Sequence, residues 1–275
     1  MSIKTFSFGG GVQSTAALVL AAQGRIDYRE FVFANVGEDS ENPATFDYLH
    51  RHAMPFAKAH GLTIHVIDRI KRDGTKETLW GRMTKPGYKG MPIPVRLNQT
   101  GAPWRRSCTY DFKVDLISKW LRKRGATTES PAVTGIGISL DEYQRMRDSR
   151  IPWQNLDYPL VDLRIDRQDC ENIIRGAGLP VPPKSSCFFC PFHSIRAWQQ
   201  LYDEQPELFE RAVWLERFLN ERQAQMGYEP VWLTDKLKPL DEVVDGAHRN
   251  QLVFDFDPSD GQYDCGPFVC AGGAA

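Results

Sequence analysis

Short apolar runs alternate with stretches of helical periodicity through the first two thirds of the chain. The apolar runs predict strands, and they cover residues 3–8, 30–35, 62–67, 131–138 and 156–163. Apolar residues at helical spacing cover residues 16–22, 43–60, 108–124 and 167–177. Because parallel strands are joined by crossover helices, this alternation predicts an α/β fold with a doubly wound, five-stranded, mainly parallel sheet.

The pattern changes after Gly178. A proline-rich stretch leads to Cys187-Phe-Phe-Cys190-Pro, and two helices are predicted over residues 195–203 and 206–226. We therefore expect two parts, an α/β domain over residues 1–178 and a small, helical, cysteine-containing region with an acidic tail over residues 179–275.

The composition is that of a globular protein. The chain has 275 residues, of which 41% are hydrophobic and 25% charged, and it is long enough to bury a substantial core. It has no apolar run of membrane-spanning length, and its N-terminus lacks a basic region followed by an apolar segment. We expect a cytoplasmic protein with no membrane partner.

The charge is distributed unevenly although its net value is only -1. Residues 69–124 hold 15 Lys and Arg against 4 Asp and Glu. A solvated surface is one interpretation of this basic block, and a polyanionic ligand, either a nucleotide or a nucleic acid, is the one we favour. Residues 68–107 also lack apolar periodicity, so we expect them to form a lid that faces the substrate.

A glycine-rich loop follows the first predicted strand. It reads Ser7-Phe-Gly9-Gly10-Gly11-Val-Gln13-Ser14-Thr15 and leads directly into a helix. Glycines let the backbone come close to a ligand, and the first N–H groups of a helix attract anions. The loop therefore predicts a phosphate-binding site, with a glycine-rich turn that binds nothing as the alternative.

This loop resembles the pyrophosphate loop (PP-loop) of the ATP pyrophosphatases and the related phosphosulfate reductases. Gly9 to Ser14 lie over the motif, but Gly9 replaces its first serine and Gln13 replaces its aspartate. The resemblance implies an adenine nucleotide alpha hydrolase-like fold that binds ATP, with Mg²⁺, or a phosphosulfate nucleotide. The residues that it places at the nucleotide are Ser7, Gly9, Gly10, Gly11, Gln13, Ser14 and Thr15.

Further stretches of the chain match the family in the same order. Asn35-Val-Gly37-Glu38 resembles the turn beside the adenosine, with Asn35 in the place of an aspartate. Gly137 ends the fourth predicted strand, and Arg145 follows it on a short predicted helix. The resemblance adds Arg105, Arg106 and Lys113 to the nucleotide-binding residues, and it gives Ser14 and Arg145 catalytic roles.

The six cysteines favour metal or redox chemistry, because disulfides are rare in a cytoplasmic protein. Cys187 and Cys190 have metal-ligand spacing, and Cys108 is the third candidate ligand. The segment around Cys108 resembles that of the adenylyl-sulfate reductases, which implies a [4Fe-4S] cluster. Its fourth ligand is missing from the family pattern, and Cys270 or Cys265 could supply it, or the fourth iron could stay open to bind a sulfur species. Structural zinc and thiols that bind no metal are the alternatives. Cys265 faintly resembles the reductases' nucleophilic cysteine, and Cys170 is expected to be a buried helix residue.

Three functions are consistent with these features. The first is a PP-loop ATP pyrophosphatase of sulfur metabolism that adenylates its substrate for sulfur transfer, as in DNA phosphorothioation. Its acceptor would be DNA or tRNA, and its partner a cysteine desulfurase or another sulfur donor. The second is a phosphosulfate reductase that releases sulfite, with Cys265 as nucleophile. The third is a catalytically silent nucleotide- or nucleic-acid-binding module with structural zinc.

Overall fold

The computed structural model describes residues 3–249, which form two compact units. Unit 1 contains residues 3–79 and 109–186, and unit 2 contains residues 80–108 and 187–249. Residues 187–249 of the region predicted from residue 179 onward thus share unit 2 with the segment 80–108, whereas residues 179–186 belong to unit 1.

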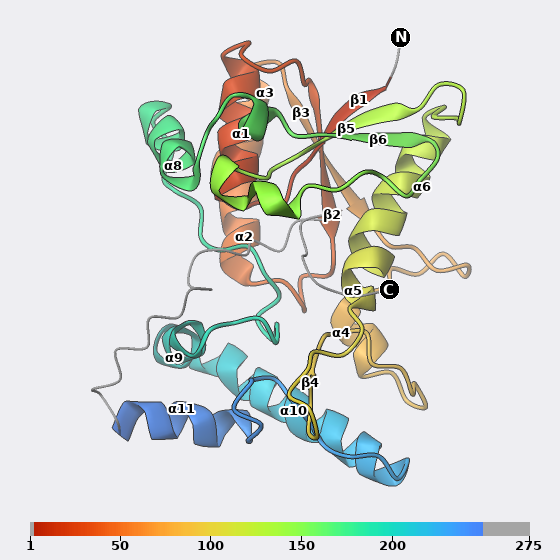
Figure 1. Ribbon diagram of the computed structural model, residues 1–275, viewed down its shortest axis with the longest axis vertical. Coiled ribbons are helices and arrows are strands. Elements are labelled where there is room, and N and C mark those ends of the chain that lie inside the picture. The colour runs from red at the N-terminus through yellow and green to blue at the C-terminus, as the bar shows by residue number, and fades with distance from the viewer. Residues whose placement is uncertain (1–2, 250–275) are drawn as a thin grey trace. The chain divides into compact units, whose positions relative to one another are not determined.

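Unit 1 is built on a five-stranded parallel sheet (Figure 1). The strand order is β3-β2-β1-β5-β6, and all four neighbouring pairs are parallel. The strands are β1 (Lys4–Ser7), β2 (Glu30–Asn35), β3 (Thr63–Asp68), β5 (Ala132–Ile136) and β6 (Gln154–Asp157). The predicted α/β fold with five parallel strands is confirmed.

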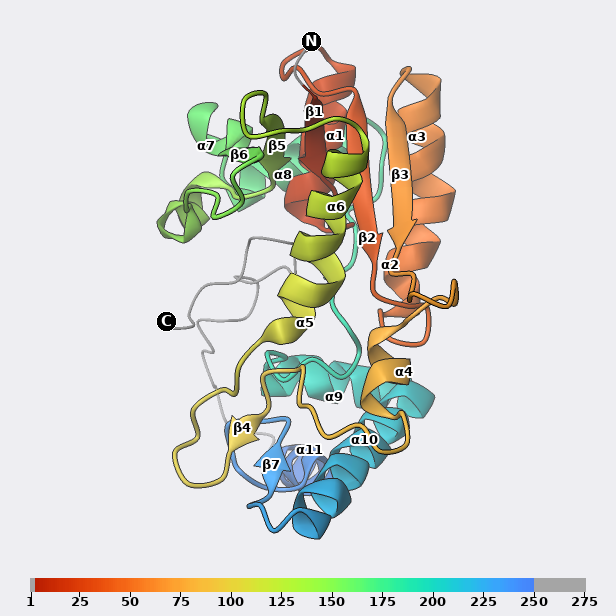
Figure 2. The same ribbon diagram turned by 90° about the vertical axis from the view of Figure 1, so that its right-hand side faces the viewer.

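Helices pack on both faces of this sheet (Figure 2). Successive side chains of a strand point to opposite faces, and β2 shows the consequence. Phe31 and Phe33 lie in a core with side chains of α1 (Val12–Ala22), α2 (Pro43–Tyr48), α3 (Met54–Ala59) and α8 (Arg167–Gly176). Val32 and Ala34 lie in a second core with Ile117 and Leu121 of α6 (Asp115–Lys123).

Two predicted helices are interrupted by π turns. The helix expected over residues 43–60 consists of α2, a π turn η1 (Leu49–Ala53) and α3. Pro55, at the start of α3, has no N–H to donate, and the backbone widens just before it. The helix expected over residues 108–124 consists of α5 (Ser107–Thr109), a π turn η2 (Tyr110–Val114) and α6.

The fifth strand is shorter than its apolar pattern indicates. It ends at Asp157, and residues 159–162, which we expected to extend it, form the helical turn α7 (Pro159–Asp162). Proline cannot donate to a strand ladder, whereas its fixed φ suits the first turn of a helix. The end of this strand was therefore predicted wrongly.

Unit 2 is mostly helical. Its helices are α4 (Leu79–Met83), whose first residue belongs to unit 1, α9 (Ile195–Glu204), α10 (Pro206–Gln225) and α11 (Leu240–Arg249). A small antiparallel pair joins β4 (Arg96–Leu97) to β7 (Val231–Trp232). Among the described residues, no helix is both long and apolar enough to span a bilayer.

Two contacts attach the segment after α4 to α10. The guanidinium of Arg222 donates from Nη1 to the Met83 carbonyl at 2.8 Å and from Nη2 to the Gly90 carbonyl at 2.9 Å. Residues 68–107, which lack apolar periodicity, are therefore ordered in part by hydrogen bonds between their backbone carbonyls and Arg222. Arg222 is far away in the sequence, so no local pattern could reveal these bonds.

A buried carboxylate on α10 holds the end of unit 2 together. Glu216 accepts hydrogen bonds from the backbone N–H groups of Leu233 and Leu240, both at 2.7 Å. Burial raises the pKa of Glu216 to about 7, because the loss of solvent outweighs the two backbone donors, which lower it.

This shift predicts how stability depends on pH. Folding raises the carboxyl pKa from 4.5 to about 7, so the stabilisation from this group is full below pH 4.5 and is lost as pH rises through about 7. Glu216→Ala should be less stable at acidic pH but should show a flatter pH dependence between these values. Thermal unfolding across this pH range measures both slopes. Glu210→Ala, on an exposed position of the same helix, should keep the wild-type slope; parallel slopes for Glu216→Ala and wild type would contradict the assignment.

Candidate nucleotide-binding site

The glycine loop lies at the carboxyl end of the central strand of unit 1. It leaves β1 after Ser7, and α1 begins at Val12. β1 lies between β2 and β5, so the chain proceeds from β1 to one side of the sheet and later returns to the other (Figure 1). In open parallel sheets, ligands bind at the carboxyl edge where the strand order reverses in this way.

Two glycines are required by the geometry of the loop. Gly10 has φ +79°, and a Cβ there would lie 3.0 Å from Thr45 Cγ2. Gly137, in the loop after β5, leaves little space for a side chain, because its Cβ would lie 3.2 Å from the Ser14 nitrogen and 3.3 Å from Gln13 Cβ. The backbone after β5 therefore approaches the first turn of α1 closely.

The N-terminus of α1 is buried and has no side-chain cap. Gly11 occupies the N-cap position, and the first turn contains no acidic residue. The first backbone bond of the helix runs from Thr15 N to the Gly11 carbonyl at 3.0 Å, so the N–H groups of Val12, Gln13 and Ser14 have no acceptor within the helix. The Ser14 hydroxyl donates to the Gly11 carbonyl at 3.1 Å and does not cap these groups. Helix N–H groups without an acceptor in the helix and the helix dipole together favour an anion at this position.

Two buried polar atoms beside the loop are unsatisfied. Within the described part of the chain, Ser7 Oγ and Gln13 Oε1 have no hydrogen-bond partner. A buried polar group without a partner costs roughly 1–3 kcal/mol. A polar ligand that bonds to them would remove this cost.

A buried polar chain connects Gln13 to Arg145. Gln13 Nε2 lies 3.2 Å from Glu142 Oε2 and 3.4 Å from Ser139 Oγ, and Glu142 forms an ion pair with Arg145. Gln13, Glu142 and Arg145 are only 2–3% exposed. Glu142 and Arg145 belong to the 3₁₀ helix η3 (Leu140–Arg145), which replaces the expected short helix after the fourth strand.

Gln13 and Arg145 were selected separately from the sequence, and Glu142, expected only as a polar residue at the carboxyl edge of the sheet, joins them. Glu142 gave no local signal, because its contact with Gln13 spans 129 positions in the sequence. A carboxylate at position 13 would face Glu142 directly, and this gives a physical reason for an amide there.

In the turn after β2, the residues predicted to lie beside the adenosine make contacts within and next to the turn itself. Asn35 Oδ1 accepts from the Gly37 N–H at 2.8 Å, and Asn35 Nδ2 donates to Asp68 Oδ1 at 2.9 Å. Gly37 has φ +118°, and a Cβ there would lie 2.5 Å from Thr78 Cβ. Asn35 and Gly37 therefore shape the turn, and Glu38 is exposed.

A second buried carboxylate lies beside the glycine loop and was missed. Ser185 Oγ donates to the Gly9 carbonyl at 2.6 Å and lies 3.4 Å from Glu41 Oε1. Thr45 Oγ1, at 3.3 Å from the same oxygen, also contacts Glu41. Ser185 reaches the loop from the segment that follows α8, so only the folded chain brings it there.

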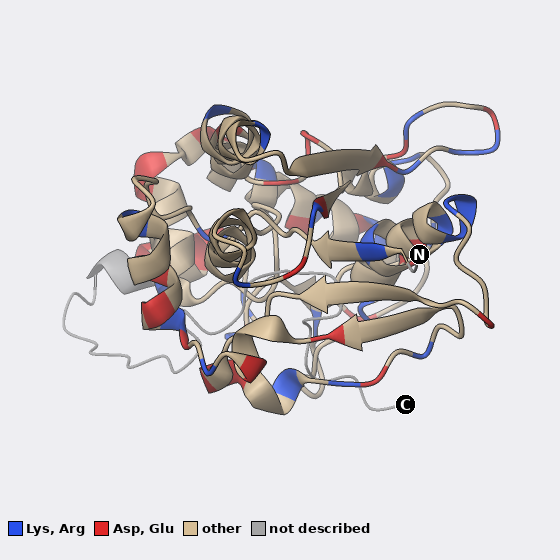
Figure 3. Ribbon diagram, turned by 90° about the horizontal axis from the view of Figure 1, so that it is seen from above, with Lys and Arg blue, Asp and Glu red and all other residues tan. Residues whose placement is uncertain are grey.

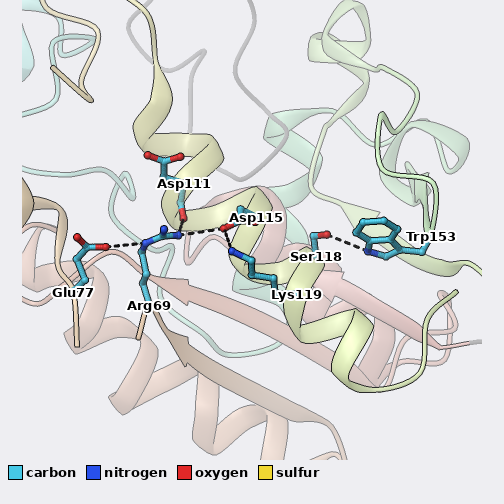
Figure 4. A network of polar contacts seen from close by, with 7 residues as sticks. All are labelled: Arg69, Glu77, Asp111, Asp115, Ser118, Lys119 and Trp153. Atoms are coloured by element: carbon cyan, nitrogen blue, oxygen red, sulfur yellow. Dashed lines mark hydrogen bonds and ion pairs between the residues drawn. The ribbon is translucent and has the colours of Figure 1, made fainter. Parts of the chain in front are cut away.

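The basic block is divided between the two units. In unit 1, Arg69 forms ion pairs with Glu77 at 2.9 Å and Asp115 at 3.2 Å, and Asp115 also pairs with Lys119 at 2.6 Å (Figure 4). Arg124 pairs with Glu30 at 2.6 Å. Figure 3 shows acidic residues interspersed with basic ones along the chain. Much of the basic charge of unit 1 is therefore balanced by carboxylates, as on a solvated surface.

The three basic residues expected at the nucleotide are separated in the same way. Lys113 is buried in η2 of unit 1. Arg105 and Arg106 belong to unit 2, where the Arg106 guanidinium lies 5.0 Å from the centre of the Phe192 ring. Their role at a nucleotide stays a prediction.

Three of the cysteines expected to bind a metal, Cys108, Cys187 and Cys190, lie within the described residues. Cys190 N donates to the Cys187 carbonyl at 3.1 Å, which gives a tight turn, and Cys108 belongs to the same unit. In residues 3–249, however, no three His, Cys, Asp or Glu side chains come together so that they could hold a metal ion. Cys265 and Cys270 lie outside the described residues. Cys170 is buried in α8, as expected, and burial raises the pKa of its thiol.

Known proteins add no further constraint. A scan against models of protein families finds no match, and a search of curated proteins finds no sequence of significant similarity. The likeness to PP-loop proteins therefore depends on the motif residues and on the geometry described above.

The polar chain predicts the effect of a charge at position 13. Gln13→Glu should lower the free energy of unfolding by about 3 kcal/mol, because it places a second carboxylate against the buried Glu142. Glu142→Gln should also lower the free energy of unfolding, because it removes the carboxylate from the buried ion pair with Arg145. Urea unfolding measures both effects.

Gln168→Glu is the matched control, because Gln168 is also the second residue of a helix, α8, but is exposed. It should change stability by less than about 0.5 kcal/mol. Equal effects at the two positions would show that the buried contact with Glu142 is not the cause.

Proposed function

We propose that this chain is a PP-loop enzyme of sulfur metabolism that binds ATP through its phosphates at the glycine loop. The observation that carries the proposal is the buried, uncapped N-terminus of α1, behind Gly10 and Gly11 and beside the close approach of Gly137. In the finer proposal, the fold is the doubly wound, adenine nucleotide alpha hydrolase-like type with a cysteine-containing C-terminal region, and the protein is cytoplasmic.

The proposed reaction is adenylation. A substrate oxygen attacks the α-phosphorus of ATP, the bond to the β-phosphate oxygen breaks, and pyrophosphate leaves. A sulfur donor then displaces AMP from the activated substrate, which we propose to be DNA or tRNA. The contribution of the loop is to position the phosphates and to stabilise charge on them through backbone N–H groups, with Ser14 in the first turn.

Two cofactors accompany this proposal. Mg²⁺ prefers oxygen ligands and is commonly held in part by nucleotide phosphates, and Glu41 is a buried carboxylate beside the loop that could add a ligand. A [4Fe-4S] cluster or zinc would use Cys108, Cys187 and Cys190, but the described residues do not assemble this set. No step of the proposed reaction is assigned to a cluster.

A phosphosulfate reductase is the second candidate, and Gln13 favours it. Its nucleotide arrives already activated and releases no pyrophosphate, so the aspartate of the ATP-cleaving members is not needed. In that reaction the Cys265 thiolate would attack the sulfonate sulfur, and the bond from that sulfur to the nucleotide phosphate oxygen would break. An external thiol would then attack the Cys265 sulfur, expel sulfite and leave a mixed disulfide that a second thiol reduces.

Product analysis tests the proposal. Purified protein is incubated in parallel with ATP plus oligonucleotide and with a phosphosulfate nucleotide plus a thiol reductant. Pyrophosphate from ATP supports the first function, and sulfite from the phosphosulfate supports the second. Nucleotide binding without either product would favour the silent binding module.

The glycine loop predicts the effect of a substitution on binding. Gly11 has φ -96° and ψ -175°, a conformation open to any residue, so Gly11→Val should fold. Its side chain should obstruct the phosphates and weaken nucleotide binding at least about 100-fold, as measured by calorimetry. Gly176→Val is the control, because a Cβ at Gly176 meets nothing within 4 Å. Unchanged affinity for Gly11→Val would remove the loop from the proposed site.

The cysteine turn predicts metal content. Iron, zinc and acid-labile sulfide are measured in protein purified without oxygen, for the wild type and for Cys187→Ser. We expect the substitution to remove the metal, together with any cluster absorbance, and to leave ATP binding in place. Cys170→Ser is the control, because Cys170 is buried in unit 1. Metal content unaffected by Cys187→Ser would contradict the assignment of this turn as a metal site.

A further inference from the structure

The segment 80–108 of unit 2 carries only positive charge. It contains six Lys and Arg residues and no Asp or Glu, and aromatic residues lie among them. The basic residues are Arg82, Lys85, Lys89, Arg96, Arg105 and Arg106, and the aromatic ones are Trp80, Tyr88 and Trp104. Basic residues interleaved with aromatic ones are typical of surfaces that bind nucleic acid.

Three basic residues of this segment are accessible. Lys85, Lys89 and Arg105 are exposed, and within residues 3–249 none of them forms an ion pair. Part of the basic charge of unit 1 is paired with carboxylates, as at Arg69, Lys119 and Arg124. The three charges of unit 2 are therefore available to an anionic partner.

A hairpin presents one tryptophan of the segment to solvent. Leu97 N donates to the Ala102 carbonyl at 3.0 Å, and Trp104 N donates to the Val95 carbonyl at 2.8 Å. The hairpin is held in turn by the pairing of β4 with β7. Trp104 is nevertheless 43% exposed, directly before Arg105 and Arg106. A large apolar ring is thus fixed at a basic surface.

A second aromatic surface runs along α10. Trp80 stacks on Trp214 with ring centres 5.7 Å apart, and Trp214 stacks on Phe218 at 5.1 Å. The Arg211 guanidinium lies 4.7 Å from the centre of the Trp80 ring. Trp214 is 48% exposed. The loop after α4, with Lys85 and Lys89, passes alongside α10, to which Arg222 bonds it (Figure 2).

We propose that unit 2 binds single-stranded nucleic acid, with one base stacked on Trp104, another packed against the exposed part of Trp214, and phosphates bound by Lys85, Lys89 and Arg105. Stacking on a side chain requires unpaired bases, because in a duplex the faces of the bases are already stacked. The alternating ring and cation chemistry matches the alternating base and phosphate of such a strand. This inference deepens the proposed function, since it identifies a surface for the acceptor.

The test measures binding of a fluorescein-labelled oligothymidine to the full chain by anisotropy at several salt concentrations, with no nucleotide added. An oligomer of about 20 nucleotides exceeds a single binding site. Trp104→Ala and Trp214→Ala should each weaken binding about tenfold without a change in salt dependence. Trp104→Phe and Trp214→Phe keep a ring and should retain most of the affinity. Lys85→Gln with Lys89→Gln should reduce the slope of log affinity against log salt by about 1.4, because each phosphate contact contributes about 0.7.

Two controls share the chemistry of these changes but lie outside the surface. Tyr143→Ala removes an aromatic ring of unit 1 that is 63% exposed, and Arg51→Gln removes an arginine of unit 1 that pairs with Asp47 at 2.7 Å. Both should bind the oligomer as the wild type does. Circular dichroism and thermal unfolding establish that each variant is folded.

The inference would be overturned if the wild-type protein did not bind the oligomer, or if the Trp104→Ala and Trp214→Ala variants bound it as the wild type does. It would also be overturned if duplex were bound as tightly as single strand, because that would indicate general attraction to polyanions. Because no nucleotide is present, failure here is distinguishable from failure at the glycine loop. Gly11→Val should bind the oligomer normally. Pyrophosphate release without oligomer binding would reject the nucleic-acid surface of unit 2 but leave the proposed function of the glycine loop intact.

Discussion

The architecture of unit 1 depends on one buried helix end. α1 follows the central strand directly and is buried along almost its whole length, so its first N–H groups cannot be satisfied by bulk water. The positive φ of Gly10 turns the chain from strand to helix, and the lack of a side chain at Gly137 lets the neighbouring strand end close behind that turn. A fold that buries an uncapped helix terminus needs a partner for it, and an anion is the partner that its polarity favours.

The polar residues around this helix end form a supporting layer. Glu142 holds the Gln13 amide on one side, and Ser185 connects the Gly9 carbonyl to Glu41 on the other. Each of these buried groups is bonded to another, so the layer fixes the loop conformation without placing a negative charge in the first turn of α1. The Gln13 amide keeps that turn neutral, as suits a site for phosphates.

The two units differ in how they use basic residues. In unit 1, Arg69 and Arg124 are tied to carboxylates, which gives them structural roles. In unit 2, Arg222 is tied to backbone carbonyls, but the segment 80–108 contains no acidic residue of its own. Charge that is contiguous in sequence is therefore distributed over both units, and only part of it is paired with carboxylates.

The sequence alone determined the features that depend on local chemistry. Apolar runs of strand length separated by helical periods predicted the parallel sheet, because burial on both faces of a strand leaves that pattern. The glycine loop was recognisable because Gly10 needs a positive φ where the strand turns into the helix. Local chemistry also determined the burial of Cys170, since its position on an amphipathic helix fixes which way it faces.

Only the tertiary structure decided which distant residues meet. Glu142, Glu41 and Ser185 carry no local signal, because contacts such as Ser185 with Gly9 join positions far apart in the chain. The same holds for the assignment of residues 80–108 to unit 2, which depends on the pairing of β4 with β7 and on the Arg222 contacts. The strand expected to reach residue 163 ends early because a proline has no N–H for the ladder, whatever the apolar pattern around it. Periodicity and turn chemistry are read over a few residues, whereas the surroundings of a buried polar group are set by packing across the whole unit.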